Sequence, residues 1–162
     1  MRTMTRMFVP ALLLSLTTGA SMGAQRAPQG DAAKLIGEWR LVEMEQDGGD
    51  DPARGARPIG IIYYSATGHM AAQIMPDRKR ASWPNTTQPT ATQALDAVIG
   101  YAAYFGTYTV DERAKVVTHR REGALNFDVV DFVRSYAFEG NDRLVLFPKE
   151  RANRRLVWER VK

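Results

Sequence analysis

The sequence predicts an all-β protein, an up-and-down antiparallel barrel of about eight strands with one inserted helix. From about residue 34, short stretches of β-branched, aromatic and aliphatic residues alternate with Gly, Asp, Asn and Pro, a pattern typical of barrels and sandwiches. Turn sequences containing Gly or Asn separate neighbouring stretches, so sequential strands should pair antiparallel. The last strand can then close on the first and leave no exposed edge.

The first 24 residues have the three-part layout of a secretory signal peptide. Arg2 and Arg6 precede the apolar run 7–16, and small and polar residues follow it. Cleavage is expected near Gly23 or Ala24. An uncleaved anchor is the less favoured alternative, because the apolar run is shorter than the roughly 20 residues that cross a bilayer. We therefore expect export and a periplasmic or extracellular location.

Composition and charge set the limits of the mature chain. Residues 25–33 are polar and contain Pro and Gly, which predicts a flexible arm before one barrel domain over 34–162. The chain has no cysteine and therefore no disulfide. The net charge is +4, but both signs are interleaved, so we expect no nucleic-acid partner, and we read the basic stretch 151–155 as a solvated turn.

Eight strands follow from the period-two alternation of apolar residues. Their predicted ranges are 38–45, 58–65, 69–75, 104–111, 115–122, 129–139, 142–148 and 154–161. Hairpin turns are expected at Thr67-Gly68, at 111–114 and at 140–142, where Gly and Asn accept the positive φ of such turns.

An amphipathic helix is predicted over 90–104, between the third and fourth of these strands. Leu95, Val98 and Ile99 recur at helical spacing after Thr90 or Thr92 as N-cap. A long polar loop containing three prolines precedes the helix. The helix either covers one end of the barrel or packs on its outer wall, and the sequence leaves both open.

Several stretches between Leu35 and Val161 together resemble the lipocalin-like domain family of the calycin type. They are "LIGEWRLVEME", "PIGIIYYSATGHMAAQIMPDR", "YAAYFGTYTVDERAKVVTHRREG", "VRSYAFEGNDRLVL" and "LVWERVK". The resemblance implies a small barrel with an internal pocket for an apolar or mixed small molecule. It also implies that some relatives guide isomerisation or cyclisation in biosynthetic pathways, and that Gly37, Trp39 and Arg160 close one barrel end, with the arginine across the indole.

Two charged residues fall on faces that the strand period predicts to be internal. Glu43 shares a face with Trp39, and Arg134 shares one with Phe132 and Tyr136. A buried guanidinium needs a partner, either Glu43 or a bound molecule. Two alternatives stay open: a one-residue bulge turns Glu43 outward, or a different strand phase turns Arg134 outward.

Tyrosines and one histidine favour a cavity over a solid core. Several closely spaced tyrosines, among them Tyr104 and Tyr108, would each need a hydroxyl partner if the core were solid. His119 is either a general acid or base or a hydrogen-bonded wall residue. The second reading is preferred because no nucleophile or oxyanion motif accompanies it. His69 and His119 lack metal-ligand spacing, so we expect neither a metal nor another cofactor.

The preferred hypothesis is an exported, non-enzymatic barrel that binds a small hydrophobic or amphipathic molecule, as a monomer or weak homodimer without stable membrane insertion. The predicted ligand-binding residues are Tyr63, Tyr104, Tyr108, His119, Arg134, Tyr136 and Trp158. The alternative is an isomerase or cyclase with His119, Glu43 and Arg134 in the active positions. A third reading is a solid barrel that acts through its outer surface.

Overall fold

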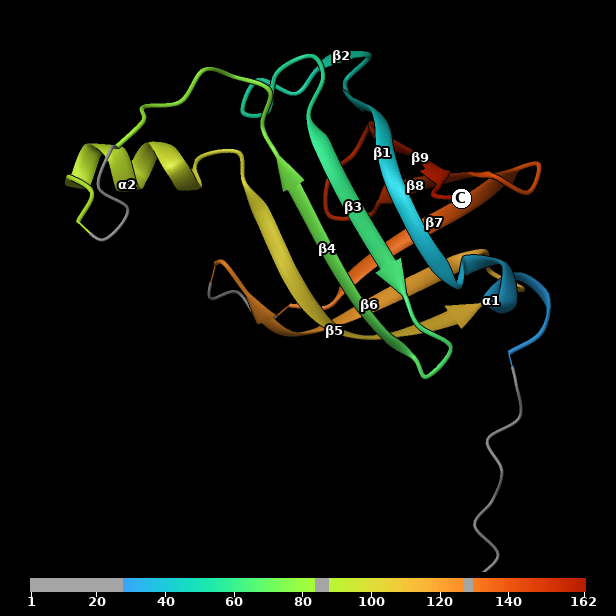
Figure 1. Cartoon of the computed structure of the whole chain (residues 1–162). Helices are drawn as coiled ribbons and strands as arrows, with labels where there is room; N and C mark the ends of the chain where they lie inside the picture. Colours follow the sequence, from blue (N-terminus) through green and yellow to red (C-terminus); the bar gives the residue numbers. More distant parts are fainter. Residues whose placement is uncertain (1–27, 84–87, 127–129) are drawn as a thin grey trace, which may run out of the picture.

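A computed structural model describes residues 28–83, 88–126 and 130–162, and these form a closed antiparallel barrel of eight strands (Figure 1). The strands are β1 (Gly37–Gln46), β3 (Ile59–Tyr64), β4 (His69–Met75), β5 (Ala102–Asp111), β6 (Val116–Ala124), β7 (Phe132–Glu139), β8 (Arg143–Pro148) and β9 (Arg154–Arg160). Each pairs with the next, and β9 returns to β1. The predicted up-and-down barrel is thus confirmed.

Three short elements complete the described chain: α1 (Gly30–Leu35), β2 (Gly49–Asp50), which pairs with the end of β1, and α2 (Ala91–Val98). Part of the predicted arm, from Gly30 onward, therefore lies in α1. The predicted signal peptide lies outside the described residues. Among the residues that the structure describes, no helix is both long and apolar enough to cross a membrane.

The end of the barrel next to α1, which we call the floor, is closed around Trp39. The Trp39 side chain is fully buried, and its indole N–H donates to the Leu35 carbonyl at 2.8 Å. The Arg160 guanidinium lies 4.1 Å from the Trp39 ring centroid and donates to the carbonyls of Ile36 and Lys34. Gly37 has φ +129°, and a Cβ there would meet Arg160 Nη1 at 2.9 Å. Glycine is therefore required beside this arginine.

Side-chain contacts attach α1 to the floor. Asp31 accepts a hydrogen bond from the Tyr136 hydroxyl at 3.0 Å and forms an ion pair with Lys115 at 2.5 Å. The hydrogen bond from Lys115 lowers the pKa of Asp31, against the opposing effect of burial. The predicted arm thus ends in a helix that is held by charged contacts.

A β-bulge changes the phase of β1 halfway along the strand. The register between β1 and β9 shifts between Leu41 and Glu43. Leu41 and Met44 are both buried, whereas Glu43 pairs with Arg155 at 2.5 Å, and both of those side chains are about one-third exposed. Of the two positions left open for Glu43, the structure shows the outward one, because the extra residue of the bulge turns its side chain to the outer wall.

Helix α2 lies beyond the end of the barrel opposite the floor, between β4 and β5 (Figure 1). Thr90 is the N-cap and forms a capping box with Gln93. The helix ends at Val98, earlier than predicted. Gly100 follows at φ +77°, where a Cβ would lie 2.1 Å from the Ala53 carbonyl oxygen. Every residue of α2 is exposed or half-buried, so the helix does not pack into the outer wall.

Candidate functional site

The barrel contains a cavity of about 720 Å³ on the side away from the floor. The lining comes mainly from the strand ends nearest α2 and β2. Its apolar part includes Met44, Ile62, Ile74, Phe132, Leu146 and Trp158. Ligand pockets commonly measure about 300–1,000 Å³ and are mostly apolar with a few polar groups. The cavity has the size and the wall of a small-molecule site.

Arginines dominate the charged part of the cavity. Among the described lining residues, five are arginines and Glu150 supplies the acidic side chain. The five are Arg54, Arg121, Arg134, Arg151 and Arg154. The cavity is therefore electropositive on the side where these residues gather.

Two of these arginines share one aromatic ring. The guanidinium carbons of Arg121 and Arg134 lie 3.9 and 4.6 Å from the centroid of the Phe132 ring. Arg121 is buried and donates through Nε to the Val130 carbonyl at 2.7 Å. Tyr104 meets the same ring edge-on at a centroid distance of 5.4 Å. The aromatic face offsets part of the cost of holding two cations away from water.

Behind Tyr104, the buried His119 joins two tyrosine hydroxyls. Its Nε2 lies 2.7 Å from the Tyr64 oxygen, and its Nδ1 lies 3.1 Å from the Tyr104 oxygen. Burial lowers the pKa of His119 well below its ordinary value, and the charge of Arg134 adds to that effect. His119 is therefore a neutral imidazole that bridges the two phenols.

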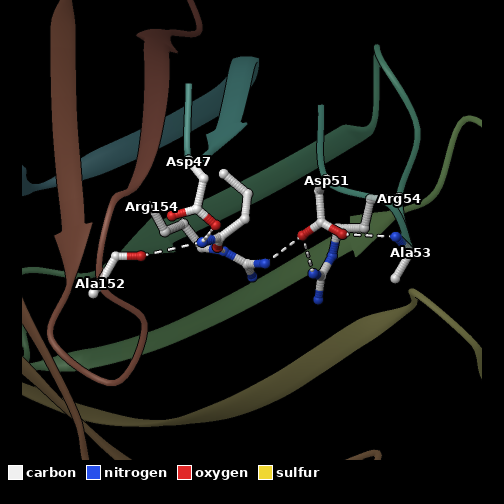
Figure 2. Close-up of polar contacts among 7 residues, drawn as sticks. Asp47, Asp51, Ala53, Arg54, Ala152 and Arg154 are labelled. Atoms are coloured by element: carbon white, nitrogen blue, oxygen red, sulfur yellow. Dashed lines mark hydrogen bonds and ion pairs between the residues drawn. The ribbon is translucent and has the colours of Figure 1, made fainter. Parts of the chain in front are cut away.

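An ionic cluster at the upper rim, which we call the Asp51 latch, ties the loop after β2 to the start of β9 (Figure 2). Asp51 is buried and accepts hydrogen bonds from Arg54, at 3.0 Å, and from Arg154. Burial raises the pKa of Asp51, but the Ala53 N–H and both arginine charges outweigh it, so the net shift is downward. Arg154 also donates to Gln46 at 2.9 Å. Two of the five cavity arginines are thus paired with one carboxylate.

The predicted ligand-binding residues divide into three that line the cavity and four that do not. Tyr104, Arg134 and Trp158 line it. His119 lies behind Tyr104. Tyr63 is 48% exposed on the outer face, and its prediction as a lining residue is wrong because its neighbour Tyr64 takes the inward position of β3.

The remaining two tyrosines are buried elsewhere. The Tyr108 hydroxyl donates to the Ser65 carbonyl at 2.8 Å, and the Tyr136 hydroxyl donates to Asp31 at the floor. Neither residue is among the described residues that line the cavity, so the prediction that they line it is wrong.

The three residues that the isomerase or cyclase hypothesis needs are not brought together. Glu43 lies on the outer wall with Arg155. His119 has both ring nitrogens occupied by tyrosines, and only Arg134 of the three lines the cavity. No carboxylate and histidine therefore meet at the cavity surface as a general acid and base would among these predicted residues.

Four arginines of the cavity were not predicted as lining residues: Arg54, Arg121, Arg151 and Arg154. Arg121 shares the strand face of His119, so the alternation that placed His119 inside points to it as well. Arg154 belongs to the basic stretch read as a solvated turn, yet it is buried against Asp51. Arg54 lies in a Gly- and Asp-rich loop without periodicity, and no sequence signal marks it.

Comparison with known proteins identifies the family. The lipocalin-like domain family matches residues 36–161, nearly the whole described chain. A comparison with curated protein sequences finds no match. Among solved structures, a redesigned β-barrel is similar with a TM-score of 0.44 and 8% sequence identity, over 81% of this chain and 95% of that one. The family match covers the whole barrel, from the residue before Gly37 to the residue after Arg160, and this chain therefore belongs to the lipocalin-like domain family.

Proposed function

We propose that the protein binds a small amphipathic molecule in the barrel cavity. The observation that carries the proposal is the cavity itself, about 720 Å³ with an apolar wall and a cluster of arginines. A cavity with an apolar wall and a separate charged part suits a ligand with an apolar body and a polar end. We do not extend the proposal to isomerase or cyclase activity, because Glu43 lies outside the cavity and His119 is held between two tyrosines.

The test is native mass spectrometry of the protein purified from its own host, followed by a thermal-shift screen of lipids and polyketides. We expect a retained mass above that of the polypeptide, or ligands that raise the melting temperature. A ligand present at 100 times its Kd adds about 2.7 kcal/mol to the free energy of unfolding. A polypeptide without a retained mass and without a thermal shift across the library would remove the proposal.

We also propose that the protein acts after export. The support is the layout of residues 1–24, with two arginines, an apolar run and small residues near Gly23. Mass spectrometry of the mature chain from its host is expected to place the N-terminus near Ala24 or Gln25. An intact Met1 in the mature protein would contradict export by this route.

A further inference from the structure

We propose that the ligand is an aliphatic or aromatic carboxylate whose anionic group is held by Arg134 and the Tyr104 hydroxyl beside Phe132. This inference rests on the proposed function and adds the chemical class of the ligand. It is carried by three properties of the described cavity: its unpaired donors, its charge balance and the direction of one hydroxyl proton.

The unpaired buried polar atoms of the cavity are all donors. Within the described chain, Arg134 Nη1, Arg54 Nε and Trp158 Nε1 are buried without a hydrogen-bond partner, and all three residues line the cavity. A buried donor without an acceptor costs about 1–3 kcal/mol. These three donors therefore lack acceptors, which a carboxylate supplies and an ammonium group does not.

The register of the sheet separates these donors along the barrel. Arg134 pairs with Pro148 near the open end, whereas Trp158 pairs with Leu144 closer to the floor. The interactions with Phe132 place Arg134, Arg121 and Tyr104 around one ring. An anionic group therefore belongs near Phe132, and the apolar body extends toward Trp158.

The charge balance favours an anion over a neutral polar group. Arg54 and Arg154 share Asp51. Ion pairs elsewhere in the described chain extend to 4.0 Å. Among the described residues, no carboxylate oxygen lies within that distance of the Arg121 or Arg134 guanidinium. Buried guanidinium groups are normally paired, because isolation in a low-dielectric interior costs several kcal/mol. A bound carboxylate would pair with this charge.

The hydrogen-bond chain through His119 sets the direction of the Tyr104 proton. The Tyr64 side chain is fully buried, and His119 Nε2 is its hydroxyl partner in the described structure. The Tyr64 hydroxyl must donate to Nε2, since accepting from Nε2 would leave its own proton buried without an acceptor. The neutral His119 then carries its proton on Nδ1 and donates it to the Tyr104 oxygen.

The Tyr104 hydroxyl consequently has its own proton left to donate. Tyr104 lines the cavity beside Phe132, so this proton is available to an acceptor bound in the cavity. Burial raises the pKa of Tyr104, which keeps the hydroxyl protonated at neutral pH. The phenol and the guanidinium thus form a donor pair suited to the two oxygens of one carboxylate.

The test compares decanoate, decanol and decylamine, three probes with the same apolar chain, by isothermal titration calorimetry. The variants are Arg134→Met, Arg134→Lys and Tyr104→Phe. Arg120→Met is the matched control, because Arg120 is exposed on the neighbouring strand β6. Thermal denaturation of each variant shows that it is folded before titration.

We expect the wild-type protein to bind decanoate at least tenfold more tightly than decanol, with decylamine weakest. Arg134→Met should weaken decanoate binding about 10- to 100-fold while leaving decanol within about threefold, as expected for loss of a charged hydrogen bond. Arg134→Lys should retain part of the preference, Tyr104→Phe should weaken decanoate several-fold, and Arg120→Met should change neither probe.

Three results would overturn the carboxylate inference and leave the proposed function standing. They are equal binding of decanoate and decanol, a preference for decylamine, and an Arg134→Met variant that keeps full preference for decanoate. Failure of all three probes to bind the wild-type protein would overturn the carboxylate inference. The proposed function then depends on its own test, the retained mass and the library screen.

Discussion

His119 shows how a residue type suited to catalysis takes a positioning role in this barrel. Histidine exchanges protons near neutral pH when it is solvated. Here burial is complete, and both ring nitrogens are within hydrogen-bond distance of tyrosine hydroxyls. The lowered pKa keeps the ring neutral. His119 therefore orients Tyr104 and does not itself reach the cavity surface.

The lowered pKa of His119 predicts a specific loss of stability in mild acid. Below about pH 6.5 the unfolded chain binds a proton at His119 that the folded chain does not. The stability contributed by the neutral ring is thus complete above that pH and declines as the pH falls toward the folded pKa. The free energy of unfolding should fall by about 1.4 kcal/mol per pH unit in this window.

Urea denaturation at pH 7.5, 6.5 and 5.5 measures this dependence. His119→Asn is expected to be less stable at pH 7.5 and to lack the additional decline. His69→Asn removes the exposed histidine and should keep the wild-type slope. A slope that disappears in the His69 variant, or persists in His119→Asn, would contradict the assignment.

Strand β1 performs two tasks because its phase changes within the strand. Its first half places Trp39 in the floor under Arg160, and its second half, after the bulge, places Met44 in the cavity wall. The bulge lets one strand keep an apolar inner face at both ends while Glu43 stays at the outer surface. Floor and cavity are therefore separable in function.

Trp39→Ala tests this separation. The substitution should lower the free energy of unfolding by about 3–5 kcal/mol, the usual cost of truncating a buried tryptophan. The fraction of the variant that remains folded should bind decanoate with an affinity within about threefold of the wild-type value. Phe105→Ala removes an outer-wall aromatic that is 57% exposed and should cost less than about 1 kcal/mol.

Chemical denaturation and calorimetric titration of the two variants provide the measurements. An unchanged stability in Trp39→Ala with abolished binding would show that the floor belongs to the ligand site instead.

At the scale of the whole molecule, the Asp51 latch links the loop after β2 to the start of β9, segments 103 residues apart in the chain. The latch holds the upper rim of the cavity in the way that Trp39 and Arg160 hold the floor. Asp51 and Arg154 are buried charges, and the stability of such groups depends on keeping them paired.

Asp51→Asn should therefore destabilise the barrel by about 3–5 kcal/mol, because Arg154 would stay buried without a carboxylate. Asp50→Asn changes the exposed neighbouring carboxylate and is expected to stay within about 0.5 kcal/mol of the wild-type protein. Thermal and urea denaturation at pH 7 compare the two. Equal stabilities of the two variants would show that the latch contributes nothing beyond surface charge.

Local sequence was enough for the strands, the hairpin turns and the start of α2. Alternation, Gly-containing turns and the Thr90 cap are properties of neighbouring residues, which is why these predictions agree with the structure. The geometry around Gly37, Trp39 and Arg160 likewise agrees with what the family resemblance implied. The predicted helix was too long because residues 102–104 belong to strand β5 instead. All three pair with β4, and Tyr104 also pairs with Ala124 of β6.

The inward or outward position of the polar residues depended on the tertiary structure. A one-residue bulge reverses Glu43, and a one-residue difference in phase separates Tyr63 from Tyr64, because successive side chains of a strand point to opposite faces. Arg154 is buried because Asp51, far away in the chain, meets it. The sequence by itself determined an eight-stranded barrel, and the family resemblance implied its floor around Trp39. The folded chain decided which charges line the cavity, because their pairing depends on contacts between distant segments.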